Sequence, residues 1–189
     1  MEATTISLAG GAHATLARPV ESDASAVIAY FELVAGETDF LSFGAGELER
    51  TLEDEAAEIR ALANPSRGLM LLAKVSNELA GIVTIHRFSR PRVHHRGELG
   101  VSVQRKFWGL GIGRALCEAA IVEARHIGLT RIDLHTRHDN ARAIALYENL
   151  GFQLEGRIRA AFRVGELFHD DLAMGLRLHP ELIHAAQPR

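Results

Sequence analysis

The stretch that decides the fold is residues 101–116, which read Val-Ser-Val-Gln-Arg-Lys-Phe-Trp-Gly-Leu-Gly-Ile-Gly-Arg-Ala-Leu. It begins with apolar residues in alternation, as in a strand, passes through three glycines, and continues as a helix pattern. Glycine has no Cβ, so backbone N–H groups at such a turn can approach a ligand closely. The unpaired donors and partial positive charge of a helix N-terminus suit a phosphate or pyrophosphate. The stretch therefore predicts an anion-binding turn between a strand and a helix.

Two common phosphate cradles do not fit this turn. A P-loop requires Gly-Lys-Ser/Thr at its end, and that run is missing here. The dinucleotide-binding fingerprint requires a glycine three residues after Gly111, where this chain has Arg114. A dinucleotide-binding module is therefore a disfavoured alternative, which binding of NAD would revive.

Apolar periodicity on both sides of the turn predicts a mixed sheet flanked by helices, in the order β, α, α, β, β, β, α, β, α, β, β. Residues 1–12 are small and glycine-rich, which is typical of a loose or edge-pairing start. We expect strands over residues 14–18, 69–75, 79–88, 98–103 and 131–135, two more strands within 152–178 around a turn near Gly165, and helices over about 24–34, 47–63, 112–127 and 140–150.

Several side chains have expected places in the first and third of these helices. Asp23 is the expected N-cap of the first helix. Cys117 has no indicated histidine partner, so we expect an inert buried thiol in the third helix. Glu123 interrupts the apolar stripe of the same helix. That stripe is expected to face the core, and it consists of Ile112, Ala115, Leu116, Ala119 and Val122.

The composition is typical of one globular domain over residues 1–189, with a core at about 14–178: 47% of the 189 residues are hydrophobic and 24% are charged. A net charge of −3 argues against a nucleic-acid partner. The single cysteine excludes an internal disulfide and fits a reducing compartment. No basic segment precedes Arg18, and no apolar run approaches the ~20 residues of a membrane span. We therefore expect a cytoplasmic protein with no membrane partner.

The ten histidines form no known metal motif. The adjacent His94 and His95, and the pair His135 and His138, lack the helical i, i+4 spacing and the acidic partner of zinc motifs. We therefore expect no metal site.

A second motif lies about thirty residues after the glycine turn, at residues 140–152: Asn-Ala-Arg-Ala-Ile-Ala-Leu-Tyr-Glu-Asn-Leu-Gly-Phe. With these two motifs in this order, the chain resembles the GNAT superfamily of acyl-CoA-dependent N-acetyltransferases, over about residues 14–178. The family's second segment, Asn-x-x-Ala-x-x-x-Tyr-x-x-x-Gly-Phe, is matched throughout. Its loop pattern, Gln/Arg-x-x-Gly-x-Gly/Ala, is matched at Gly111 and Gly113, whereas Trp108 stands at the first position. This departure affects one side-chain contact and leaves the backbone donors intact.

The resemblance implies a fold and a reaction. The fold is an α/β structure with a central, mostly antiparallel sheet, splayed between the strands at 99–103 and 131–135, with helices on both faces. The reaction is transfer of an acetyl group from acetyl-CoA to a primary amine, by direct attack in a ternary complex and without a metal. A catalytically inactive acyl-CoA-binding sensor is the alternative. A homodimer is implied by family habit alone.

The acceptor amine stays open: a small amine, an amino-acid analogue or a protein N-terminus all agree with the resemblance. In relatives, the walls of the acceptor side correspond to residues 37–43 and 159–169 of this chain. The acidic residues near the first of these segments suit a cationic amine, and they equally suit an ordinary solvated loop.

The resemblance also implies roles for individual residues. Tyr147 would protonate the leaving thiolate, although its position on a helix face with Leu146 and Leu150 also fits core packing. Asn140 would cap its helix and contact the CoA arm. Glu98, which alternates away from Leu99, is the candidate general base, and a solvated carboxylate is the alternative. The residues implied to bind acetyl-CoA are Val101, Ser102, Val103, Gly109, Leu110, Gly111, Ile112, Gly113, Arg114, Asn140 and Tyr147.

Overall fold

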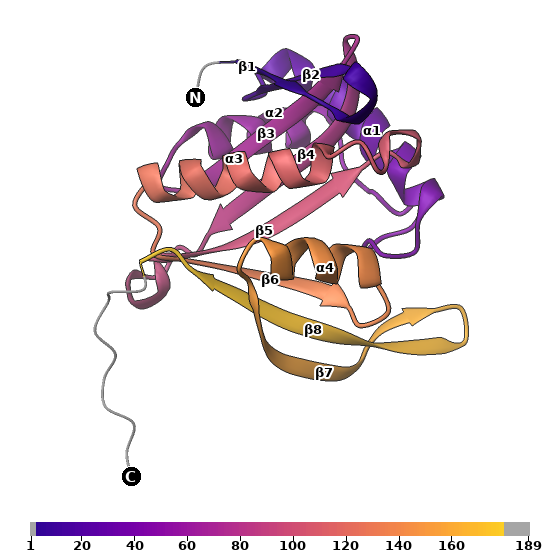
Figure 1. Ribbon diagram of the computed structural model, residues 1–189, viewed down its shortest axis with the longest axis vertical. Helices are drawn as coiled ribbons and strands as arrows, with labels where there is room; N and C mark the ends of the chain where they lie inside the picture. Colours follow the sequence, from indigo (N-terminus) through magenta and orange to yellow (C-terminus); the bar gives the residue numbers. More distant parts are fainter. Residues whose placement is uncertain (1–2, 180–189) are drawn as a thin grey trace.

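An eight-stranded sheet runs through residues 3–179, the part of the chain that the computed structural model describes (Figure 1). Its strands lie in the order β1-β2-β3-β4-β5-β6-β8-β7. The strands are β1 (Thr4–Ser7), β2 (His13–Ala17), β3 (Gly68–Val75), β4 (Glu78–Arg87), β5 (Arg96–Val103), β6 (Arg131–Arg137), β7 (Gln153–Val164) and β8 (Leu167–Arg177). The helices are α1 (Ala24–Glu37), α2 (Leu52–Ala63), α3 (Ile112–His126) and α4 (Ala141–Asn149). The expected mixed, mostly antiparallel sheet is confirmed, and the chain start pairs at its edge as β1.

The sheet is splayed between β5 and β6, its one parallel pair. These two strands pair over only three residues each, ending at Glu98 and Asp133. Beyond that point β5 continues along β4 as far as Val103, while β6 continues along β8 as far as Arg137. Each strand keeps its antiparallel partner and leaves the other, so a gap opens in the middle of the sheet, as the resemblance implied.

Each face of the sheet carries its own apolar core. The core under α1 and α2 consists of Ala24, Val27, Tyr30, Val34, Ile59, Leu62, Met70, Leu72, Leu79 and Ile82. The larger core under α3 and α4 includes Leu69, Leu71, Val83, Ile85, Leu99, Ile112, Leu116, Ile132, Leu134 and Tyr147. In Figure 1, α3 crosses β3 and β4, and α4 lies over the part of the sheet that β6 and β8 form.

These cores show which way the residues of β5 and β6 point. Leu99 and Val101 pack into the α3 core, whereas the Ser102 Oγ lies 3.0 Å from the hydroxyl of Tyr30 on α1. Since successive side chains alternate between faces, Glu98 and Gly100 also face the α1 side. On β6, Ile132 and Leu134 pack into the α3 core. Asp133 and His135 therefore share the α1 side with Glu98.

Three sequence expectations about the helices need correction. Helix α2 begins at Leu52 and not at residue 47, because a reciprocal cap fixes its start: Asp54 N–H donates to Thr51 Oγ1 (3.1 Å), and Thr51 N–H donates to the Asp54 carboxylate (3.0 Å). Asp23 occupies the expected N-cap position of α1, but its carboxylate accepts from the Val20 N–H at 2.9 Å and caps no α1 group.

The third correction concerns the buried face of α3. Val122, expected in the core, is 48% exposed, while Glu123 is buried. Arg18, which directly follows β2, reaches the Glu123 carboxylate at 2.6 Å, and this ion pair helps to offset the cost of burying the charge. The buried face is thus rotated toward Cys117, Ala120, Ile121 and Ala124. Cys117 is fully buried, as expected, and burial raises the pKa of its thiol to about 12.

Candidate active site

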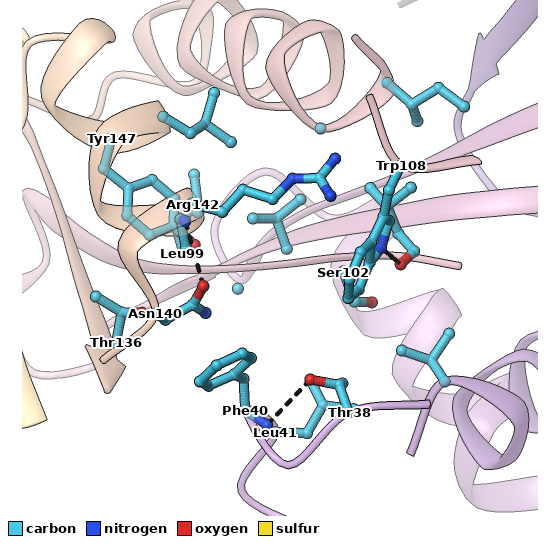
Figure 2. A pocket seen from close by; sticks show the side chains of 18 of the residues that line it. Thr38, Phe40, Leu41, Leu99, Ser102, Trp108, Thr136, Asn140, Arg142 and Tyr147 are labelled. Carbon is cyan, nitrogen blue, oxygen red and sulfur yellow. Dashed lines mark hydrogen bonds between the residues drawn. The ribbon is translucent and has the colours of Figure 1, made fainter. Parts of the chain in front are cut away.

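The gap between β5 and β6 opens into a cavity of about 740 Å³, shown in Figure 2. Side chains from β5, β6, the start of α3, α4 and the loop after α1 line it. Among the lining residues are Thr38, Phe40, Leu41, Ser42, Glu98, Gly100, Val101, Trp108, Gly111, Arg114, His135, Thr136, Asn140, Arg142, Tyr147 and Phe162. A cavity of this size lies within the usual range for small-molecule sites.

The glycine turn forms one end of the cavity. Gly109 and Gly111 have φ values of +83° and +91°, and no atom lies within 4 Å of where their Cβ atoms would be. Only glycine adopts this left-handed backbone readily. Helix α3 begins at Ile112, and no side chain caps it. The first N–H groups of a helix have no partner inside the helix, so here they are available to a ligand. The predicted anion-binding turn therefore has the geometry it needs.

The edge of β5 forms one wall. Hydrogen-bonded residues alternate along an antiparallel pair, and the Gln104 N–H donates to the Ala80 carbonyl on the β4 side (3.0 Å). The backbone groups of Val101 and Val103 consequently point away from β4, into the gap. The Val103 carbonyl already has a partner within the protein, because the indole N–H of Trp108 donates to it at 2.7 Å.

Trp108 also organises the cationic rim of the cavity. Its ring lies 4.8 Å from the guanidinium carbon of Arg142 and 5.5 Å from that of Arg105. In Figure 2 the Arg142 side chain reaches from α4 toward Trp108. With Arg114, these side chains place positive charge near the start of α3. The sequence interpretation treated Trp108 only as a missing contact and did not single out Arg142.

Tyr147 lines the cavity from α4 and is 6% exposed. Its ring packs edge-on against Phe152, with the ring centres 5.9 Å apart. Burial raises the pKa of the Tyr147 hydroxyl above its usual value, so the phenol keeps its proton at neutral pH. The core and site interpretations of this residue are compatible. Asn140 has the predicted capping role, because its Oδ1 accepts the Ala143 N–H at 3.2 Å, and it lines the cavity as well.

On the α1 side of the cavity, two strands present ionisable side chains. The Glu98 carboxylate is exposed and forms no hydrogen bond or ion pair within residues 3–179. Across the gap, the Nδ1 of His135 lies 2.6 Å from the Oδ2 of Asp171 on β8. The sequence interpretation missed this pair, since its members are 36 positions apart and neither belongs to a motif.

The structure brings together all but one of the predicted site residues. Leu110 is the exception: it does not line the cavity, its side chain packs against the α3 core, and its carbonyl accepts the Ala9 N–H at 3.2 Å. Leu110 thus anchors the glycine turn to the core. Of the two expected acceptor walls, the loop after α1 contributes residues 38, 40, 41 and 42, and the β7–β8 hairpin contributes Phe162.

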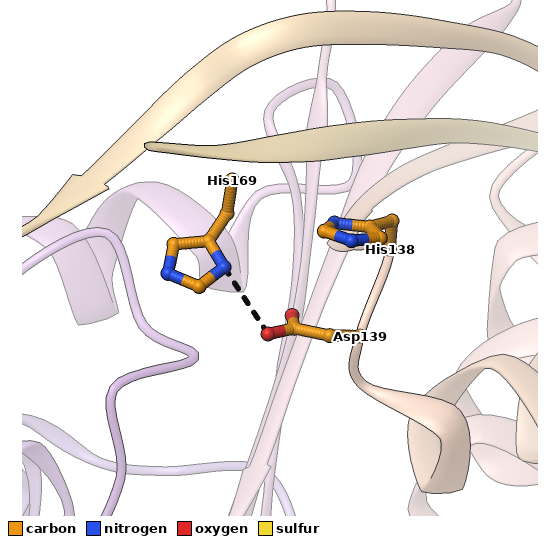
Figure 3. Close-up of side chains that lie close together, drawn as sticks. All are labelled: His138, Asp139 and His169. Carbon is orange, nitrogen blue, oxygen red and sulfur yellow. Dashed lines mark ion pairs between the residues drawn. The ribbon is translucent and has the colours of Figure 1, made fainter. Parts of the chain in front are cut away.

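One cluster outside the cavity has the residue types of a metal site: His138, Asp139 and His169 (Figure 3). Arg137 already holds both Asp139 oxygens, at 2.9 and 2.6 Å, and lowers the pKa of that carboxyl to about 2. The Nδ1 of His169 lies 3.2 Å from the same carboxylate. With the carboxylate occupied by a guanidinium, the cluster fits a link between β8 and the loop before α4 better than a cation site.

Comparison with known proteins agrees with this geometry. Residues 35–152 match the model of the acetyltransferase (GNAT) family. The L-amino acid N-acetyltransferase AaaT of Escherichia coli is 33% identical over 98 residues, which is 51% of this chain and 60% of that protein. A mycothiol acetyltransferase of Propionibacterium freudenreichii is 42% identical over 60 residues, 31% of this chain and 19% of that protein. The matches thus span less than two thirds of either relative.

Solved structures match over more of the chain. An acetyltransferase of the GNAT family from Streptococcus pneumoniae superposes with a TM-score of 0.84 and 30% identity, covering 87% of this chain and 98% of that one. The protein yncA from Salmonella typhimurium, determined with its cofactor acetyl-CoA, has the same fold (TM-score 0.79, 20% identity, 93% and 98% covered). Among residues 3–179, no helix has the length and apolar character needed to cross a membrane.

Proposed function

Because this chain belongs to the GNAT acetyltransferase family, we propose that it moves the acetyl group of acetyl-CoA to a primary amine by direct attack in a ternary complex. One observation carries this proposal: the β5–β6 gap opens beside the uncapped N-terminus of α3. The helix start suits a pyrophosphate, and the free strand edge suits the amides of a pantetheine arm. Acetyl-CoA supplies a thioester, whose carbonyl carbon accepts the amine and whose sulfur leaves.

The chain's own residues would hold acetyl-CoA at three places. The N–H groups of residues 109–114, with the guanidinium of Arg114, bind the pyrophosphate. The backbone of residues 101–103 orients the arm and polarises the acetyl carbonyl. Asn140 and Tyr147 close the opposite wall, and Arg142, stacked on Trp108, adds a cation beside the phosphates.

Two side chains would act on the reacting groups. Tyr147 holds a neutral phenol in a buried position and donates its proton to the leaving sulfur. Glu98 offers an unpaired carboxylate on the acceptor side, where it attracts an ammonium group and is the base that the sequence predicts. We also propose that the chain works as one domain in a reducing compartment such as the cytoplasm, since its one cysteine is a free, buried thiol.

The test compares acetyl-CoA, CoA, NAD and ATP by thermal shift, all at one concentration that is about a hundred times the dissociation constant of acetyl-CoA. A ligand at about a hundred times its dissociation constant adds about 2.7 kcal/mol of stability. At about 2–4 °C per kcal/mol, the melting temperature should rise by about 5–10 °C with both CoA species and stay unchanged with NAD. Arg114→Ala should weaken the shift, while Arg125→Ala, exposed on the same helix, should not.

Transfer itself is then measured as CoA release with a panel of amino acids, small amines and peptides. Binding of acetyl-CoA without release of CoA for any amine would support the sensor alternative. Absence of a shift with either CoA species would leave the glycine turn a purely structural feature.

A further inference from the structure

His135 and Asp171 form a histidine–carboxylate pair at the wall of the cavity. Asp171 is 4% exposed, its Oδ2 lies 2.6 Å from the His135 Nδ1, and its Oδ1 has no hydrogen-bond partner. A buried carboxylate is costly unless a donor satisfies it, so the pair is stable with the His135 Nδ1–H donating to Asp171. This tautomer leaves the lone pair of the His135 ring on Nε2.

His135 lies on the α1 side of the cavity, the side on which the acceptor is expected. The parallel strands separate after the Glu98–Asp133 pair, and His135 lies two residues further along β6, on the same face. Across the gap, Gly100 carries no side chain between Glu98 and Ser102, and the Thr84 hydroxyl, 3.5 Å from where its Cβ would be, is the only atom within 4 Å. His135 lines the cavity, and its side chain is 41% exposed.

The other charges near His135 are already paired. On its own strand, Asp133 is held by Arg96 (2.7 Å) and Arg131 (2.6 Å), and Arg137 is held by Asp139 (2.6 Å). The loop after α1 contributes the Asp39 carbonyl, which accepts from Arg137 at 2.9 Å. The β7 hairpin contributes the apolar Phe162. The Asp39 carboxylate on the loop after α1 interacts electrostatically with Arg137, and the Glu98 carboxylate on β5 forms no hydrogen bond or ion pair among residues 3–179.

Other histidine–carboxylate pairs in the protein do not share this placement. His86 with Glu58 (3.2 Å), His126 with Glu123 (3.6 Å) and His169 with Asp139 (3.2 Å) all lie outside the cavity. His135 is thus the one histidine of residues 3–179 that both lines the cavity and is held by a buried carboxylate.

From this placement we propose that His135 is the base that deprotonates the acceptor amine, with Asp171 as its positioning residue and Glu98 as the anchor of the incoming ammonium. This inference rests on the proposed acetyl transfer. It replaces the sequence prediction that Glu98 is the base: Glu98 attracts the cation, and His135 takes its proton.

The protons balance as follows. His135 Nε2 takes one proton from the ammonium, which leaves a neutral amine with a free electron pair. The amine nitrogen uses this electron pair to form the C–N bond while the C–S bond breaks. The sulfur keeps the electron pair of the C–S bond and receives the phenol proton of Tyr147. The second proton leaves the amide nitrogen and restores the phenol. His135 releases its proton to solvent, so each turnover yields one amide, one thiol and one proton.

The test compares His135→Gln with a matched control, His86→Gln, which removes a histidine from a pair on the surface. A general base contributes about 10²–10⁴-fold, so His135→Gln should lower kcat/KM for the amine at least about 10²-fold at pH 7.5. His86→Gln should change it less than threefold. The acetyl-CoA thermal shift should be the same in both variants and the wild type, which shows that each is folded and binds acetyl-CoA.

The pH dependence separates the two candidate bases. A general base that is protonated has no lone pair with which to accept a proton, so the contribution of His135 should disappear at acidic pH. The ratio of wild-type to His135→Gln kcat/KM cancels the titration of the amine itself. It should fall toward one as the pH drops from 8 to 5.5. Asp171→Asn removes the carboxylate that accepts the His135 Nδ1–H and leaves the imidazole ring in place. It should lower kcat/KM and change the pH at which the ratio falls.

Three results would contradict the role proposed for His135. If the wild type transfers acetyl groups and His135→Gln matches His86→Gln, the role of His135 is refuted while the acetyltransferase proposal stands. If the ratio is constant from pH 8 to 5.5, His135 is not the base. If the wild type acetylates no amine, both proposals fail together.

Discussion

Replacing Tyr147 with Phe removes one hydroxyl from the cavity wall and leaves the ring in place. The hydroxyl forms no hydrogen bond within residues 3–179, and the contact with Phe152 involves only the ring. The folding stability should therefore change by less than about 0.5 kcal/mol, as for a substitution that removes no partner. The acetyl-CoA affinity should also stay near normal.

The turnover rate should change much more. Without the phenol, the sulfur leaves as an unprotonated thiolate, and the loss of a general acid costs about 10²-fold in kcat. This factor corresponds to about 2.7 kcal/mol of transition-state stabilisation. The assay is steady-state CoA release at saturating amine and acetyl-CoA, together with the melting temperature of each variant.

Tyr30 provides the matched control, because it is the other tyrosine and equally buried. Its hydroxyl is bonded to Ser102 Oγ at 3.0 Å, so Tyr30→Phe should lose about 0.5–1.5 kcal/mol of stability and keep kcat within about threefold. Tyr147→Phe should show the opposite pattern, with kcat lost and stability kept. A kcat within twofold of wild type in Tyr147→Phe would remove Tyr147 from the mechanism.

Three further predictions concern the cavity and its frame. Gly100→Val should fold, because a Cβ at this position meets only the Thr84 hydroxyl at 3.5 Å. It should raise KM for the amine at least tenfold and leave the acetyl-CoA thermal shift unchanged. An unaltered KM would place the acceptor elsewhere. Arg18→Ala strips a charged partner from the buried Glu123 and should cost about 1–3 kcal/mol in urea unfolding; a loss below 0.5 kcal/mol would contradict the pairing. The pKa of Asp139 is held at about 2, so its contribution to stability is complete above the unfolded value near 3.8 and is lost as the pH falls toward 2. Asp139→Asn should therefore have a melting temperature that depends less on pH between 4 and 2 than that of the wild type, and equal slopes would refute this.

Features that depend on a few neighbouring residues could be predicted from the sequence. The glycine turn before α3 and the Asn140 cap of α4 are set by groups within four positions of one another. The alternation along β5 indicated correctly that Glu98 faces away from the α3 core. Where a competing local bond was overlooked, prediction failed: the Thr51–Asp54 cap delays the start of α2 to residue 52.

The sequence by itself determined the family, the anion-binding turn and the helix that carries Tyr147, because local backbone preferences and hydrogen bonds fix these. Only the tertiary structure decided which distant side chains meet. The buried Glu123 pairs with Arg18, 105 positions away, and the His135–Asp171 pair depends on β8 lying beside β6. Strand order and register are set by packing over the whole sheet, and no short stretch of sequence contains that information.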